Sequence, residues 1–177
     1  MVTMIHRSAV VSGCGRYRYL LERVLEYGTE ESTPVVWVLC NPSTADGRED
    51  DPTVRKCAGF TANLGYKRFI IINAFAYRAT KPRDLLKPEA FDPIGPDNWK
   101  WIAHALTDPE TGLKLLGAKV IVGWGQAVPR QLRPQLGSFV VRLREIHNRP
   151  IYCYGLTDQW MPRHPLMLSY ATPLELY

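Results

Sequence analysis

The sequence predicts a single α/β domain, a three-layer α/β/α sandwich in which helices cover a mostly parallel central sheet. Short apolar runs alternate along the chain with stretches of helical periodicity. Each run is apolar throughout, which is typical of strands that are buried on both faces. The 177 residues are enough for one domain with its own core, and no linker, repeat or low-complexity stretch divides residues 1–177.

The elements can be assigned in order along the chain. Residues 8–27 begin with the alternation of a strand and then become helix-like, and an edge strand or hairpin is the favoured interpretation. Buried strands are predicted at residues 35–40, 69–73, 120–123 and 151–154. Helices are predicted at residues 52–64, 99–106, 126–136 and 138–148, with a loop at residues 88–96. Asp51-Pro52 has the form of an N-cap followed by a first-turn proline, which marks the start of the first helix.

Distinctive residues follow each of the four predicted buried strands. Asn41 follows the first strand, Asn73 ends the second and Trp124 follows the third. His164 lies in the loop after the fourth strand. In open α/β sheets, ligands bind beyond the carboxyl ends of the strands. The sequence therefore predicts a binding crevice at this edge of the sheet.

Asn41-Pro42-Ser43 predicts a rigid turn, because proline fixes the backbone and supplies no N–H group. The backbone amides that follow, together with Ser43, are suited to holding an anion or a water molecule. The alternative is a turn in which Asn41 and Ser43 satisfy only their own backbone.

Asn73 ends an apolar strand, where an unpaired amide costs about 1–3 kcal/mol. Its C=O and NH₂ groups match the amide edge of a nucleobase, and the alternative is that they hold a neighbouring loop. Phe60 and Phe75 are candidates for stacking on a base, at about 1–3 kcal/mol each, with ordinary core packing as the alternative. Arg78 and Trp124 are further candidates for the pocket.

His164 is the histidine that lies among other site-like residues, between Arg163 and Pro165. A loop stiffened by proline can aim its ring at a ligand. The ring is then able to donate a hydrogen bond to charge that develops on a leaving group. The alternative is an ordinary surface histidine.

Asp46, Asp50 and Asp51 are candidates for a general base, a metal site or helix caps. Their spacing does not require a magnesium site, and Asp51 already has a role as an N-cap. The four cysteines do not have the spacing of metal ligands. We therefore expect structural thiols and no metal or cofactor, and a metal-dependent phosphohydrolase is a minor alternative.

The net charge is +5 and the pI about 9.1. After Lys119 the chain has arginine but no lysine, and the planar guanidinium group suits phosphate. We therefore expect the basic C-terminal third to face a polyanion, with a plain solvated surface as the alternative, and we infer no obligate protein partner. No apolar run approaches the roughly 20 residues of a membrane span, and the N-terminus does not have the pattern of a signal peptide. We expect a cytoplasmic protein.

Four segments of the sequence are VVWVLCNPS, RFIIINAFAYRAT, VIVGWGQAV and RHPLMLS. In this order they resemble the motifs of the uracil-DNA glycosylase superfamily, in which the mismatch-specific and thymine-DNA branches begin with Asn-Pro. The resemblance spans residues 35–170. More closely, the pattern NPSTAD…DDPT…NAFAYRAT…GWG…RHPL resembles a bacterial and phage family known only as a domain of unknown function.

The resemblance to the superfamily implies its fold and a catalytic arrangement. Asn41 would position the attacking water, Asn73 would read the base, and His164 would stabilise the base as it leaves with negative charge. The implied reaction is hydrolysis of an N-glycosidic bond through an oxocarbenium-like state.

The resemblance also implies contacts with nucleic acid. Arg163 would touch a flanking phosphate, and Leu168 would fill the space of an extruded nucleotide. Ser169 matches the same loop in type and spacing. Leu166 and Met167 depart from it, because they stand where the superfamily has Ser-Pro.

The leading hypothesis is therefore a hydrolase that acts on an N-glycosidic bond in DNA or in a nucleotide. Asn41 cannot serve as its general base, because an amide does not take up a proton near neutral pH. This departure motivates the alternative, a non-catalytic module that binds nucleic acid or a nucleotide.

Overall fold

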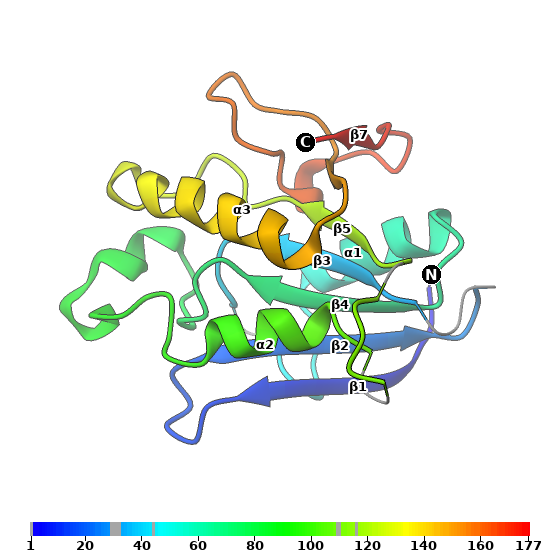
Figure 1. Ribbon diagram of the computed structural model, residues 1–177, viewed down its shortest axis with the longest axis horizontal. Helices are drawn as coiled ribbons and strands as arrows, with labels where there is room; N and C mark the ends of the chain where they lie inside the picture. The colour runs from blue at the N-terminus through cyan, green and yellow to red at the C-terminus, as the bar shows by residue number, and fades with distance from the viewer. Residues whose placement is uncertain (1, 29–32, 44, 109–110, 116) are drawn as a thin grey trace.

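The computed structural model describes residues 2–28, 33–43, 45–108, 111–115 and 117–177 (Figure 1). These residues form a seven-stranded mixed sheet of order β1-β2-β4-β3-β5-β6-β7. The strands are β1 (Met4–Val11), β2 (Arg18–Leu25), β3 (Val35–Leu39), β4 (Arg68–Asn73), β5 (Lys119–Val122), β6 (Ile151–Cys153) and β7 (Glu175–Leu176). The helices are α1 (Pro52–Asn63), α2 (Asn98–Ala105) and α3 (Arg133–His147), with 3-10 turns η1 (Pro82–Leu86), η2 (Pro88–Ala90), η3 (Arg130–Leu132) and η4 (Pro165–Met167).

The sheet is mixed rather than mostly parallel. The four strands predicted from apolar runs, β4, β3, β5 and β6, are neighbours and parallel. The pairs β1–β2, β2–β4 and β6–β7 are antiparallel. The hairpin of β1 and β2 confirms the hairpin interpretation of residues 8–27, and its attachment to β4 makes one half of the sheet antiparallel.

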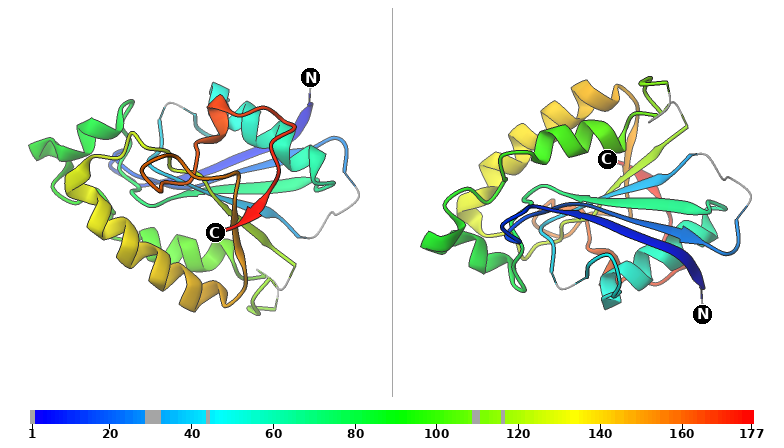
Figure 2. Two further views of the ribbon diagram at one scale, coloured as in Figure 1. Left: turned by 90° about the horizontal axis from the view of Figure 1, so that it is seen from above. Right: turned by 90° about the horizontal axis from the view of Figure 1, so that it is seen from below.

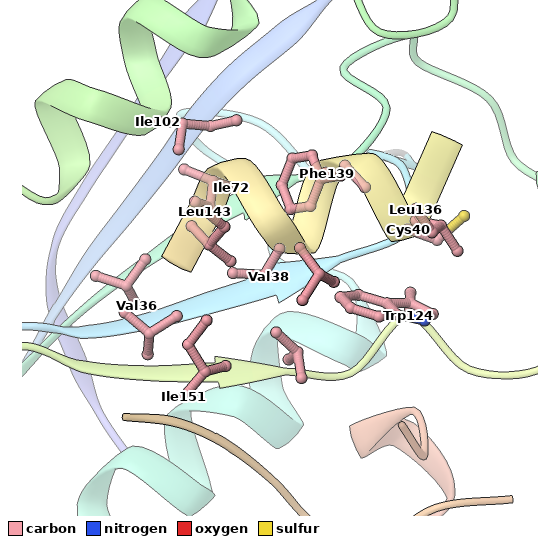
Figure 3. Close-up of a cluster of buried hydrophobic side chains, with 14 of the residues drawn as sticks. Val36, Val38, Cys40, Ile72, Ile102, Trp124, Leu136, Phe139, Leu143 and Ile151 are labelled. Carbon is pink, nitrogen blue, oxygen red and sulfur yellow. The ribbon is translucent and has the colours of Figure 1, made fainter. Parts of the chain in front are cut away.

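Alternate residues of the central strands pack on opposite faces of the sheet. Val36 and Val38 belong to a core with residues of α2 and α3, whereas Trp37 belongs to a core with residues of α1. Figure 2 shows α1 on one face and α2 and α3 on the other. In Figure 3, Phe139 of α3 is drawn above Val38, one of the strand residues in the same cluster. The helices on both faces explain why each central strand is apolar throughout.

The third helix differs from its prediction. One helix, α3, replaces the two predicted at residues 126–136 and 138–148, and η3 precedes it. Pro134 lies in the first turn of α3, where the missing N–H group costs nothing. Pro134 therefore helps to begin the helix. None of the described helices has the length and apolar character needed to span a bilayer.

Candidate functional site

A cavity of about 530 Å³ opens at the carboxyl ends of β3 and β4. The loops after β5 and β6 and the N-terminal end of α1 complete its wall. Arg18 lines it as well, because β2 runs antiparallel to β4 and so begins at this edge. The polar and aromatic residues that line it include Arg18, Asn41, Ser43, Asp51, Asn73, Trp124 and His164.

Asn41 ties two loops together at the cavity wall. Its Nδ2 donates to the carbonyl of Ala79 at 2.6 Å and to that of Pro42 at 3.1 Å. The N–H of Ala79 donates in return to the carbonyl of Pro42 at 2.9 Å. Pro42 is buried beneath this contact, and only Asn41 and Ser43 of the predicted turn line the cavity. No described residue donates to Oδ1 of Asn41, so this oxygen is the group left for a ligand or a water molecule.

Asn73 ends β4 and is 1% exposed. Its Oδ1 accepts a hydrogen bond from Nη2 of Arg18 at 3.4 Å. A guanidinium group has no acceptor, so the side-chain atom that faces Arg18 must be the oxygen. Nδ2 has no acceptor among the described residues. Asn73 therefore offers a donor to the cavity, rather than both groups of its amide.

Arg18 was not predicted as a site residue. It is 3% exposed, and burial lowers its pKa to about 10. Its Nη1 donates to the carbonyl of Ala45 at 2.7 Å, and Nε has no acceptor among the described residues. The only signal in the sequence is a charge within a strand whose other residues are largely apolar, where burial of the charge demands a partner.

His164 is held in one tautomer by its own loop. Its Nδ1 accepts from the backbone N–H of Leu166 at 3.3 Å, at the N-cap of η4. In the neutral ring the proton is therefore on Nε2. Burial lowers the pKa of His164, with the nearby charge of Asp51 acting weakly in the other direction. Near neutral pH the ring is a neutral donor at the cavity wall.

Gly125 allows the loop that carries His164 to approach the end of β5 closely. Its φ is +74°, and a Cβ built on it would lie 3.0 Å from the Cβ of His164. Its N–H donates to the carbonyl of Pro162 at 2.9 Å. The Trp124-Gly125 turn after β5 thus provides both a lining side chain and the space that His164 occupies.

The acidic segment serves mainly the fold. Asp46 accepts from the backbone N–H groups of Arg48 and Glu49, and Asp50 forms ion pairs with Arg7 and Arg23. Asp51 lines the cavity and caps α1. No three His, Cys, Asp or Glu side chains within the described ranges lie close enough together to hold a metal ion.

Asp51→Ala is expected to lower the free energy of unfolding by about 1 kcal/mol, because Oδ1 of Asp51 accepts from the N–H of Val54 at 2.9 Å. Urea denaturation measures the loss. Asp51→Asn preserves an acceptor and should recover most of it. Equal losses in the two variants would contradict the capping role.

Both phenylalanines predicted to stack on a base lie away from the cavity, in the core. Phe60 is 1% exposed and packs against the rings of Tyr154 and Tyr170, with centroids at 4.4 and 4.9 Å. Phe75 lines a separate cavity of about 210 Å³ next to Trp99. Each ring belongs to a hydrophobic core, as the alternative interpretation of these residues holds.

The remaining predicted contacts also lie off the cavity wall. Leu168 is 3% exposed and packs in the core beside α1, whereas Met167 is 83% exposed. Met167 is the last residue of the 3-10 turn η4, and Leu168 is its C-cap. Ser169 accepts from the N–H of Ala171. The other predicted site residues that do not line the cavity are Pro42, Asp46, Arg78 and Arg163.

Two further lining groups limit the chemistry of the cavity. Burial raises the pKa of the Cys40 thiol to about 12, so a thiolate nucleophile is not available near neutral pH. The ring of Trp124 is 2% exposed and packs edge-on against Tyr177 at 5.7 Å. Nε1 of Trp124 has no acceptor among the described residues.

The fold is that of an α/β protein with a cavity at the carboxyl ends of its parallel strands. The chain belongs to the family described as protein of unknown function DUF1643, whose model matches residues 18–166. This match begins at Arg18 and includes every lining residue except Met167. It confirms the predicted family of unknown function. The chain has no match among curated proteins or among solved structures.

Proposed function

We propose that the protein is a hydrolase that recognises a nucleobase and cleaves its N-glycosidic bond, in DNA or in a nucleotide, on a scaffold layered as in the uracil-DNA glycosylases. The observation that carries the proposal is that Asn41, Asn73 and His164, far apart in the sequence, line one cavity. Its volume of about 530 Å³ lies within the ordinary range of small-molecule sites.

Each of the three residues has a role that its atoms can perform. Nδ2 of Asn73 donates to a carbonyl oxygen of the base, and Nε2–H of His164 donates to an oxygen on which charge develops as the bond breaks. Oδ1 of Asn41 orients the attacking water. Water adds to the anomeric carbon as the C–N bond breaks and releases one of its protons to solvent, and the base departs as an anion that takes up a proton from solvent.

Met167 is an exposed apolar residue that lines the cavity, and Leu166 lies beside it. These are the apolar side chains that a DNA substrate would meet first. We assign to Met167 the role of filling the space of an extruded nucleotide, because Leu168 is buried.

A second candidate is a module that binds a nucleotide without turnover. It is favoured by Asn41, whose Nδ2 is committed to two backbone carbonyls and whose amide cannot take the proton of the attacking water. The two candidates share the cavity and differ only in whether the bond is cleaved.

The test is base release from oligonucleotides and nucleotides that carry uracil or modified bases, measured by chromatography. The protein should release at least one base, and Asn73→Ala should slow the release by about 10-fold or more, as expected for a lost hydrogen bond in a buried site. Asn63→Ala is the matched control, because Asn63 is exposed at the end of α1. Failure of the wild-type protein to release any base would overturn the proposal, and binding without release would favour the second candidate.

A further inference from the structure

Strand β2 holds two buried arginines whose surroundings differ. Arg23 is 0% exposed and makes five hydrogen bonds, the first from Nε to Oδ1 of Asp50 at 2.7 Å. All five donors of its guanidinium group are therefore used. Arg18 is 3% exposed and makes two hydrogen bonds to described residues, the longer of them at 3.4 Å. Only Arg18 lines the cavity.

The charge of Arg18 is not balanced within the described part of the chain. Arg18 forms no ion pair with a carboxylate of a described residue. Asp46 and Asp51 act on it from a distance, and Arg23 and Arg78 oppose them. A buried charge without a partner is costly, and proteins ordinarily pair such a charge or place it against a ligand.

Two other residues that line the cavity also have hydrogen-bond donors for which the described residues supply no acceptor. They are Nδ2 of Asn73 and Nε1 of Trp124, and Nε of Arg18 is a third such atom. All three are N–H groups, and none of the three can accept a hydrogen bond. Together with the charge of Arg18, these unused donors favour a ligand that brings hydrogen-bond acceptors and a negative charge.

We propose that Arg18 is an anion-binding residue and that the ligand of the cavity carries an oxyanion, either the phosphate of a nucleotide or a carboxylate on the base. Arg18 holds this group beside the base carbonyl that Asn73 reads, and the planar guanidinium group suits both kinds of oxyanion. The inference rests on the proposed function, since it names the class of ligand that the same cavity takes.

Calorimetric titration with two matched pairs of ligands tests the inference. The pairs are deoxyuridine with its 5′-monophosphate, and uracil with 5-carboxyuracil. The wild-type protein should bind the anionic member of one pair about 10–100-fold more tightly, the range expected for hydrogen bonds to a charged group. The pair that shows the preference identifies the oxyanion as phosphate or carboxylate.

Arg18→Met should abolish this preference, so that the two members of the pair bind with equal affinity. Arg18→Lys preserves the charge without the planar fork and should retain part of the preference. Arg149→Met is the control, because Arg149 is exposed and lies before β6, at the opposite edge of the sheet. Melting curves of each variant establish that it is folded.

The outcomes separate this inference from the proposed function. Equal affinities within both pairs, or a preference that survives Arg18→Met, would overturn the inference even if bases are released. Oxyanion binding that depends on Arg18, in a protein that releases no base, would support the inference and overturn the hydrolase.

Discussion

Arg23→Met is expected to lower the free energy of unfolding by about 3–5 kcal/mol, because it leaves Asp50 without its buried partner. The backbone carbonyls of Ser8 and Asp46 lose donors at the same time. Arg18→Met, in the same strand and equally buried, is expected to leave stability unchanged or to raise it. The substitution at Arg18 removes a charge that has no carboxylate partner among the described residues and replaces it with a side chain of similar length.

Urea denaturation of the two variants and the wild-type protein, without added ligand, measures this contrast. The double variant Arg23→Met/Asp50→Leu should recover part of the loss at Arg23, since it removes both charges of the pair. A large loss at Arg18 would mean that its two hydrogen bonds are structural. That result would weaken the assignment of Arg18 to a ligand.

The central strands could be predicted because burial on both faces makes each of them a continuous apolar run. Such a run can be recognised from the local sequence alone. Residues 35–40 and 69–73 therefore agree with β3 and β4 within one residue at each end. The antiparallel pairing of β2 with β4 depends on which edge of the parallel strands the hairpin joins. Strand β7 is only two residues long. Neither property leaves a local pattern, so the mixed sheet could not be inferred.

The placement of Asn41, Asn73, Trp124 and His164 around one cavity follows from topology, since the carboxyl ends of parallel strands meet at one edge. Which of the other candidate side chains point into the cavity could not be predicted from the sequence. The direction of Leu168 depends on η4, and that of Phe75 on the strand that it follows. Arg18 was not predicted for another reason, because its lack of a carboxylate partner among the described residues is a property of tertiary structure.

His164→Gln is expected to slow base release by about 100–1,000-fold, the usual effect of removing a donor aimed at developing negative charge. Glutamine retains a donor but not the ring, whose Nδ1 is held by the N–H of Leu166. The control is His6→Gln, because His6 is exposed on β1. A loss smaller than about threefold would contradict the role of His164 in the proposed reaction.

The pH dependence of the wild-type protein tests the same role independently. Burial lowers the pKa of His164 from its ordinary value of 6.5, so the native ring stays a neutral donor below that pH. Activity should therefore hold constant as pH falls to 6.5 and decline only below it, because protonation of Nδ1 removes the acceptor for the N–H of Leu166 that holds the ring. This decline should be absent in His164→Gln. Because the unfolded chain takes up the proton more readily, stability also falls between 6.5 and the lowered pKa, so circular dichroism must establish that the protein is folded at each pH. A decline centred above 6.5, or one that persists in the variant, would assign the titration to another group and leave His164 without its proposed part in the reaction.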